Sequence, residues 1–206
     1  IEEGSTIGSF YIWKFAGFDD DGNFLLYNKD GEVIPAEKKT ENDKQFIGNY
    51  TPKLILGWNN TFSYKNFDLG INMRSWIDFD VYNTINMYYG IQGRGNTNVL
   101  KEAYGKFNHI KGEKQICDYY LEDGTFLKID AITLGYTLNM KKYTNNLVDR
   151  IRVYATVGNV CTITGYSGMN PEVNITGWDQ GTEKFWDTGS FYPMARTYTL
   201  GMQFNF

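Results

Sequence analysis

Hydrophobic and polar residues alternate along much of this chain. The clearest alternation covers residues 54–78 and is interrupted at Lys65 and Asn66. Because a period of two residues puts successive side chains on opposite sides of an extended backbone, these residues are predicted to form a long antiparallel hairpin with a tight turn. Its hydrophobic face is formed by Leu54, Leu56, Trp58, Phe62, Tyr64, Phe67, Leu69, Ile71, Met73 and Ile77.

Three later segments follow the same pattern. Residues 132–138 and 151–157 alternate on either side of a polar turn at residues 140–149, and a last strand is predicted over residues 197–206. A sixth candidate strand covers residues 9–18. The fold class is therefore predicted to be all-β, with antiparallel strands. The hydrophobic face of the last strand consists of Tyr198, Leu200, Met202, Phe204 and Phe206.

The connections between these strands are alternately short and long. The turn at residues 65–66 is tight, residues 79–123 form a long connection, residues 140–146 a short one, and residues 161–195 a long one. A soluble β-sandwich would also alternate, but bacterial outer-membrane barrels have short periplasmic turns and long extracellular loops. The asymmetry favours a transmembrane barrel with its C-terminus in the periplasm and its long loops outside the cell.

The two faces of the strands differ in a way that suits a barrel wall. The polar face carries Asn, Thr, Ser, Gln and Gly, and burying such groups without partners would cost roughly 1–3 kcal/mol each, so this face is expected to meet water or a plug. The hydrophobic face lacks Lys and Arg in its central stretch, where either would cost about 2–4 kcal/mol in lipid. Lys128 and Asp130 share the parity of Ile132, which predicts that they lie above the lipid, on the outer side.

Composition and strand number limit the alternatives. Aromatic residues make up 17% of the chain, 22 residues are Gly and only 4 are Pro, which is typical of long strands joined by turns. A net charge of −4 leaves no basic surface for a nucleic-acid partner. No run approaches the roughly 18–20 apolar residues of a membrane helix. Since a barrel needs about eight strands or more, the chain, which begins at Ile1, is expected to be a fragment of a longer protein.

Few residues offer metal or redox chemistry. Cys117 and Cys161 could pair or remain free, and His109, the single histidine, is near neither in sequence. The acidic runs at residues 19–23 and 28–32 resemble calcium loops in their closely spaced oxygen ligands and their Gly turns. Neither run has the full ligand spacing, so a solvated turn is the alternative and no cofactor is predicted.

Three stretches resemble the C-terminal third of the SusC/RagA branch of the TonB-dependent transporters. The most specific is YLEDGTFLKI at residues 120–129, which leads to TLGYTL at residues 133–138. The second covers residues 152–173 and ends in TITGYSGMNPEV, and the third is YP at residues 192–193 with RTYTLG at residues 196–201. Residues 48–53 and the hairpin also match. Cys161, Asn170 and Asp130 depart from the family pattern.

The resemblance implies a large barrel in the bacterial outer membrane, filled by an N-terminal plug and energised by TonB through a part absent from this chain. It implies a SusD-like surface lipoprotein as partner, and import of an oligomeric nutrient, a glycan or a peptide, with no enzymatic activity. The rivals are a passive porin, which lacks a plug, and a soluble carbohydrate-binding module. The terminal aromatic Phe206, with its alternate apolar neighbours, resembles a membrane-insertion signal; the alternative is a simple interface anchor.

The last long loop holds aromatic residues that could contact a substrate or a partner. Aromatic faces can stack on sugars or peptides, whereas contact with the lipoprotein or packing of the loop are the alternatives. The same loop contains Glu172, Asp179, Glu183 and Asp187, from which a glycosidase pair could be drawn, but acidic residues are ordinary in extracellular loops. The candidate contact residues are Tyr166, Trp178, Trp186 and Tyr192.

Overall fold

The computed structural model describes residue 4 and residues 6–92, 98–145, 147–173, 186–187 and 193–206. The chain divides into two compact units. Unit 1 comprises Ile1–Lys53, Asp78–Gly124 and Tyr166–Tyr192, and unit 2 comprises Leu54–Ile77, Thr125–Gly165 and Pro193–Phe206. Each unit is therefore assembled from segments that are far apart in the sequence.

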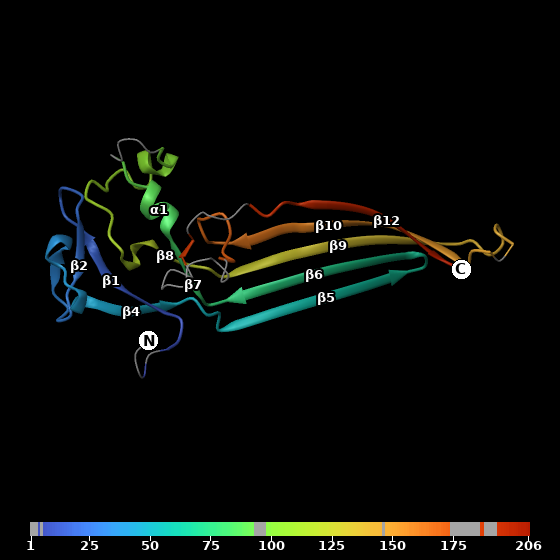
Figure 1. Cartoon of the computed structure of the whole chain (residues 1–206), viewed down its shortest axis with the longest axis horizontal. Coiled ribbons are helices and arrows are strands. Elements are labelled where there is room, and N and C mark those ends of the chain that lie inside the picture. Colours follow the sequence, from blue (N-terminus) through green and yellow to red (C-terminus); the bar gives the residue numbers. More distant parts are fainter. Residues whose placement is uncertain (1–3, 5, 93–97, 146, 174–185, 188–192) are drawn as a thin grey trace. The chain divides into compact units, whose positions relative to one another are not determined.

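Unit 2 is a five-stranded antiparallel sheet (Figure 1). Its strands are β5 (Leu54–Tyr64), β6 (Phe67–Ile77), β9 (Phe126–Asn139), β10 (Arg150–Thr164) and β12 (Thr197–Asn205), in the order β12-β10-β9-β6-β5. Tyr64 pairs with Phe67 across the two-residue turn, which confirms the predicted hairpin. The sheet is open in this chain, and the all-β antiparallel class is confirmed.

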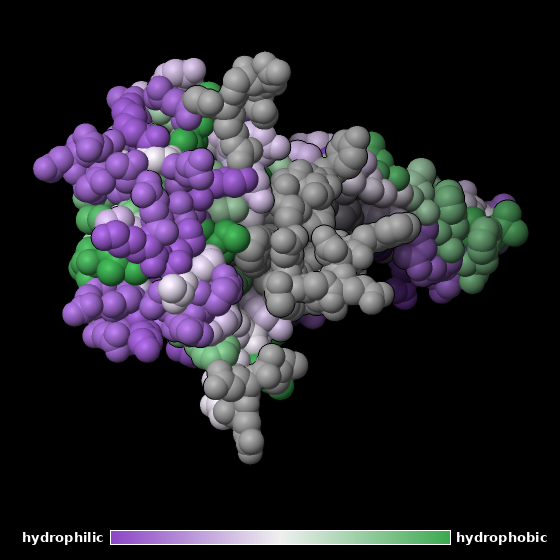
Figure 2. All heavy atoms as spheres, turned by 60° about the vertical axis from the view of Figure 1, so that its left-hand side comes forward, coloured by the Kyte–Doolittle hydropathy of each residue, from purple (hydrophilic) through white to green (hydrophobic). Residues whose placement is uncertain are grey.

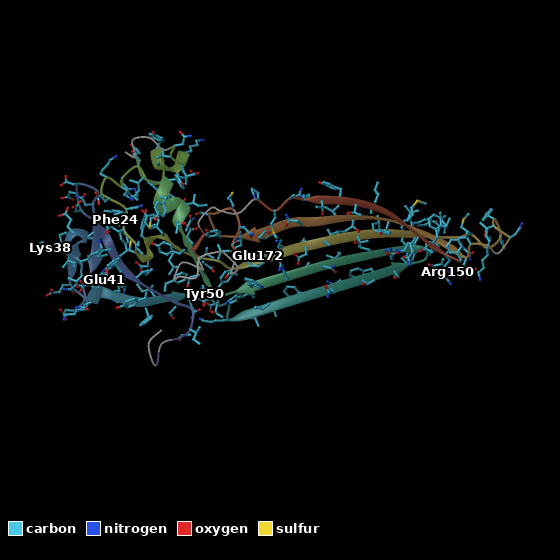
Figure 3. The ribbon with its side chains drawn as sticks, in the orientation of Figure 1. Phe24, Lys38, Glu41, Tyr50, Arg150 and Glu172 are labelled. Carbon is cyan, nitrogen blue, oxygen red and sulfur yellow. The ribbon has the colours of Figure 1, made fainter. Side chains whose placement is uncertain are left out.

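The hydrophobic positions of the five strands are in register. One row runs straight across the sheet, because each of its members is paired with the next. Side chains stand on both faces of the sheet in Figure 3, where Arg150 marks the end at which β10 begins. The row consists of Phe62, Leu69, Leu134, Ala155 and Leu200.

A bulge in β9 overturns the predicted parity of Lys128 and Asp130 with Ile132, while their predicted place above the lipid stays a prediction. Asn72 pairs with Ala131 but its neighbour Met73 pairs with Ile129, so Asp130 is an extra residue opposite β6. The insertion reverses the parity of everything before it. Lys128 therefore pairs with Arg74 on the polar face and is only 2% exposed. Asp130 forms an ion pair with the same Arg74 (Nε to Oδ2, 3.2 Å), so neither residue lies on the hydrophobic face as predicted.

The candidate strand at residues 9–18 exists but belongs to a different sheet. It is β1 (Ser9–Phe18), and in unit 1 it pairs with β2 (Phe24–Tyr27) and β4 (Lys44–Asn49), while β3 (Val33–Pro35) pairs with β2. Counting it with the barrel strands was wrong, because its apolar face is dry. That face packs into a core with many aromatic rings, formed by Phe10, Ile12, Trp13, Phe24, Leu26, Tyr82, Phe107 and Tyr120 among others.

The first long connection is folded rather than extended. It contains β7 (Asp80–Asn83), α1 (Thr84–Tyr89) and β8 (Leu121–Asp123), with short 3-10 helices η3 (Lys101–Tyr104) and η4 (Asp118–Tyr120). β7 pairs with β8 and with β11 (Trp186–Asp187), in the order β11-β7-β8. Asp118 tethers this connection to β1, because its Oδ1 accepts a hydrogen bond from the backbone N–H of Phe15 at 2.6 Å. Residues predicted as loop therefore complete the core of unit 1.

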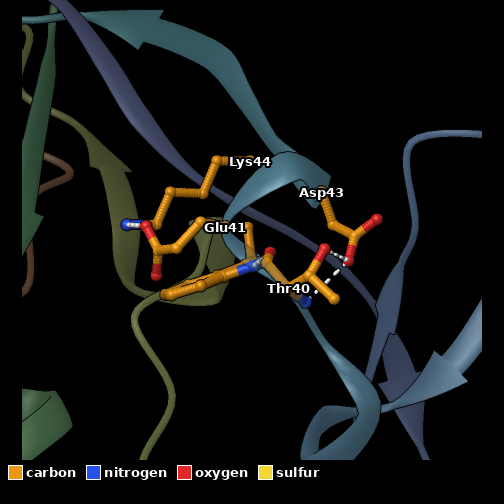
Figure 4. A network of polar contacts seen from close by, with 5 residues as sticks. Thr40, Glu41, Asp43 and Lys44 are labelled. Atoms are coloured by element: carbon orange, nitrogen blue, oxygen red, sulfur yellow. Dashed lines mark hydrogen bonds and ion pairs between the residues drawn. The ribbon is translucent and has the colours of Figure 1, made fainter.

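Two further 3-10 helices, η1 (Ala36–Lys38) and η2 (Glu41–Asp43), lie between β3 and β4. Figure 4 shows how η2 is held: the Asp43 carboxylate accepts hydrogen bonds from the backbone and hydroxyl of Thr40, both at 2.7 Å. Trp13 Nε1 donates to the Thr40 carbonyl at 2.9 Å, and Lys44 pairs with Glu41. These hydrogen bonds hold the pKa of Asp43 below its usual value, and the one from the Thr40 hydroxyl has the largest effect. This capping box fixes the entry to β4.

The two cysteines are free thiols. Cys117 is buried in the core of unit 1, and burial raises its pKa to about 12. Such a thiol stays protonated and behaves as a small core residue.

Among the described residues, no helix is long and apolar enough to cross a membrane.

Asp80 makes unit 1 sensitive to pH. Its Oδ2 accepts a hydrogen bond from the Asn49 backbone at 2.8 Å, but burial raises its pKa above the usual value, as do the neighbouring Asp123 and Asp78. Since the folded state prefers the protonated carboxyl, the stability that Asp80 contributes is fully present below the unfolded pKa and is lost as pH rises through the folded pKa.

We expect Asp80→Asn to protect unit 1 at pH 7.5, because an amide oxygen can still accept from Asn49 without the cost of a buried charge. Hydrogen exchange of residues 44–49 and 80–83, corrected for the intrinsic rate, should be slower than in the wild type at pH 7.5 and similar at pH 4. Faster exchange at both pH values would contradict this account of Asp80.

Candidate functional site

The hydrophobic face of unit 2 is exposed. Leu200 is 85% exposed, Phe62 58% and Leu134 52%, although all three lie in strands. Contiguous apolar surface of this kind marks contact with lipid or another protein. Figure 2 shows hydrophilic residues over much of the visible surface of unit 1 and hydrophobic ones along the visible part of unit 2. The exposed set includes the predicted C-terminal residues Tyr198, Leu200, Met202, Phe204 and Phe206, whose role as an insertion signal stays a prediction.

The opposite face of the sheet is polar, and several of its groups are paired across strands. Arg152 of β10 forms an ion pair with Asp68 of β6 through two nitrogen–oxygen contacts, across the intervening strand β9. The hydroxyls of Thr133 and Thr156 lie 2.8 Å apart on the same face. Paired charges and hydroxyls at this density suit a wet or plugged lumen, as the alternation predicted.

A glycine permits the ion pair that crosses β9. Gly135 pairs with Asp68 on one side and with Tyr154 on the other. A Cβ at this position would lie 2.6 Å from Nη2 of Arg152 and as close to the Asp68 carboxylate. The glycine of the TLGYTL stretch therefore leaves room for the two charged side chains that pass over it, and a larger residue would displace their ends.

Replacing Gly135 by Val is expected to separate Asp68 from Arg152 and to destabilise the sheet by about 1–3 kcal/mol, the usual cost of a broken, partly buried polar pair. The destabilisation can be measured by electrophoresis of the full-length protein after heating: the variant should lose the mobility of the folded form at a lower temperature than the wild type. Gly70→Val is the matched control, because nothing lies within 4 Å of a Cβ built on Gly70. If the two substitutions destabilise the sheet equally, the ion pair is not the reason why a glycine is needed at residue 135.

In unit 1, the carboxylate of Glu122 joins three segments. Its Oε1 accepts hydrogen bonds from Asn83 Nδ2 (3.0 Å), Asn86 Nδ2 (3.2 Å) and Ser167 Oγ (2.8 Å), and its Oε2 accepts from the Ser167 backbone (2.8 Å). Asn83 ends β7 and caps α1, since its Oδ1 accepts from the backbone of Asn86 at 3.0 Å. Glu122 belongs to the YLEDGTFLKI stretch and Ser167 to TITGYSGMNPEV, so the structure brings two of the resembling stretches together.

A hollow of about 280 Å³ lies beside this Glu122 clamp. Ile85, Leu100, Phe107 and Met169 supply apolar walls. The polar lining includes Asn86 and Ser167 of the clamp, together with the oppositely charged Glu102 and Lys106. Apolar walls with a few placed polar groups are typical of ligand sites. None of these lining residues was selected as a candidate from the sequence, although Ser167, Gly168 and Met169 lie within the TITGYSGMNPEV stretch that carries part of the resemblance.

Of the four predicted contact residues, Tyr166 is the one whose side chain the structure describes, and it is not among the described residues that line the hollow. Tyr166 is buried, with 5% of its surface exposed, and its ring lies where a Cβ on Gly168 would be. Trp178 and Tyr192 lie outside the described residues, and so does the side chain of Trp186, whose backbone forms β11. Their contact with a substrate or partner stays a prediction.

The acidic runs form ordinary turns. Asp19 Oδ1 accepts hydrogen bonds from the backbones of Asp21 and Asn23, at 3.0 and 2.8 Å. In the second run, the Asn28 side chain plays the same role for Asp30 and Glu32. Among the residues whose placement is known, no group of three or more His, Cys, Asp or Glu could hold a metal ion. The question of calcium in these loops stays open to a binding measurement.

Comparison with known proteins identifies similar chains over the whole length. No family model matches. The chain is 28% identical to TonB-dependent receptor P3 of Formosa agariphila over 100% of this chain and 23% of the receptor, and 28% identical to TonB-dependent receptor SusC of Bacteroides thetaiotaomicron over 98% and 20%. The chain thus spans about a quarter or less of the curated relatives it matches.

Solved structures share the fold. A chain of the RagAB peptide importer in the open-open state matches with a TM-score of 0.74 and 22% identity, over 96% of this chain and 22% of that one. The closed-closed state also gives 0.74, with 23% identity over 95% and 23%. The resemblance to the SusC/RagA branch of TonB-dependent receptors is confirmed, and the antiparallel fold is that of a segment of these larger chains.

Proposed function

We propose that this chain supplies barrel strands and extracellular loops to a TonB-dependent receptor that imports an oligomeric nutrient, a glycan or a peptide, across the bacterial outer membrane. The observation that carries the proposal is the similarity to TonB-dependent receptors along the whole chain. The exposed hydrophobic row of unit 2 supports it, because lipid would cover that face. The relatives are named as receptors, and the proposed role involves no bond chemistry.

The topology supports one orientation. The connections at residues 65–66 and 140–149 leave one end of the sheet, and the segments of unit 1 leave the other. With the short turns on the periplasmic side, as in bacterial outer-membrane barrels, the end of β12 would lie in the periplasm and the long connections that form unit 1 would lie outside the cell. In this arrangement, a SusD-like surface lipoprotein would meet the loops of unit 1, and TonB would act through a part of the protein beyond this chain.

Energy dependence of uptake tests the proposal. Cells that carry the full-length protein should accumulate labelled malto-oligosaccharides or labelled oligopeptides, and a protonophore should abolish accumulation. A deletion strain is the baseline, and a strain without TonB should behave like it. Equilibration that persists with the protonophore would indicate a passive porin, and recovery of the full-length protein in the soluble fraction would overturn the barrel.

A further inference from the structure

The hollow beside the Glu122 clamp is small. Its volume of about 280 Å³ is at the lower limit of ligand pockets, which run from roughly 300 to 1,000 Å³. A space of this size holds one side chain with its flanking backbone rather than a whole oligomer. The hollow can therefore accommodate only one unit of a longer ligand.

The walls suit an aliphatic group better than a sugar ring. Phe107 is the one aromatic residue among the described lining residues, and it is only 4% exposed, so it presents no open face for stacking. Met169, by contrast, is 58% exposed, and its flexible thioether side chain adapts to varied aliphatic shapes. Burying a Val or Leu side chain against such walls contributes about 1.5–3 kcal/mol.

The polar lining suits a peptide backbone and its charges. The side chains of Glu102 and Lys106 have no hydrogen-bond or ion-pair partner within the described part of the chain, although both line the hollow and are exposed. They offer one negative and one positive charge. The side-chain N–H groups of Asn86 donate hydrogen bonds to Glu122 and Ser167. The side-chain oxygen, Oδ1, is left as an acceptor for an N–H group of a ligand. An amide N–H beside an aliphatic side chain matches this set.

We propose that the hollow is a peptide subsite, in which an aliphatic side chain packs against Ile85, Leu100 and Met169 while Glu102 and Lys106 attract charged groups of the same peptide. The inference rests on the proposed import function and specifies its substrate class. A glycan would find hydrogen-bonding groups here but, among the described lining residues, no exposed ring on which to stack.

Binding to the purified full-length protein tests the subsite. The probes are a pool of octapeptides with Leu, Val or Met at the four central positions, a matched pool with Ser, Asn or Gly there, and maltoheptaose. We expect the aliphatic pool to bind at least about tenfold more tightly than the polar pool. Met169→Glu should weaken binding of the aliphatic pool by about tenfold or more, because it places a charge against the apolar wall.

Charge variants provide a second test, which does not depend on whether Met169→Glu disturbs the fold. Lys106→Glu and Glu102→Lys change exposed residues and should each weaken peptide binding. Lys101→Glu is the matched control, because Lys101 is an exposed neighbour of Glu102 in helix η3 and is not among the described lining residues. Peptide binding that none of the pocket variants alters would overturn the subsite and leave the import function standing. Binding of maltoheptaose but of neither pool would also overturn it. Absence of energy-dependent uptake of either class would instead reject the import function itself.

Discussion

Replacing Leu200 by Arg is expected to prevent stable assembly of the protein in the outer membrane. Leu200 is 85% exposed and ends the hydrophobic row that crosses all five strands of unit 2. If lipid covers this row, an arginine there costs about 2–4 kcal/mol near the bilayer midplane, which is a large part of a domain's stability. The full-length variant should therefore be depleted from the outer-membrane fraction and accumulate as degraded or unassembled chain.

Two companion substitutions separate lipid exposure from other causes. Leu134→Arg changes the same row in the middle strand of the sheet and should fail in the same way, although it lies outside the C-terminal segment. Thr199→Arg changes the adjacent residue of β12, which pairs with Thr156 and so faces the polar side, and it should assemble nearly as well as the wild type. Equal assembly of Leu200→Arg and Thr199→Arg would show that lipid does not cover the hydrophobic row.

The sequence was sufficient to predict the long strands because their pattern is local. The hairpin at residues 54–78 needs no information beyond alternation and a two-residue turn, and its register agrees with the structure. The same counting placed Lys128 and Asp130 on the wrong face, because a single inserted residue at Asp130 reverses parity without leaving a mark in the hydrophobic pattern.

Assembly from distant segments could not be predicted from local pattern. The strand at residues 9–18 was located with its observed bounds but assigned to the wrong sheet, since alternation does not say whether an apolar face meets lipid or a core. That face meets rings such as Tyr82 and Tyr120, which come from the long connection. Glu122 was overlooked as an individual residue because its partners Asn83 and Ser167 are 39 and 45 residues away in the sequence.

The contacts of individual residues show what several positions in the resembling stretches do in the fold. Gly135 leaves room for the Asp68–Arg152 pair, and Gly201 leaves room for the ring of Tyr154, so two glycines of β-strands reflect side chains on neighbouring strands. Glu122 and Ser167 lie in two different resembling stretches and are hydrogen-bonded to each other. The structure thus adds pairwise contacts to the strand pattern of these stretches.

The Glu122 clamp is expected to hold the segment after β10 in place, and Glu122→Ala should release it. The substitution removes the acceptor of four hydrogen bonds, and it leaves the Ser167 N–H and part of the buried Asn83 amide without partners. The exposed Ser167 N–H can then pair with water, but leaving a buried donor such as the Asn83 amide unpaired costs about 1–3 kcal/mol. Because every 1.4 kcal/mol changes an opening equilibrium roughly tenfold, hydrogen exchange of residues 166–173 and 83–89 should accelerate by about one to two orders of magnitude.

The effect should be confined to unit 1 in the full-length protein. Exchange within β9 and β10 should stay at the wild-type rate, since neither strand contributes to the clamp. Glu113→Ala is the matched control, because Glu113 is an exposed glutamate of the same unit whose side chain makes no hydrogen bond or ion pair within the described residues. If Glu122→Ala and Glu113→Ala give the same exchange at residues 166–173, the carboxylate does not anchor this segment.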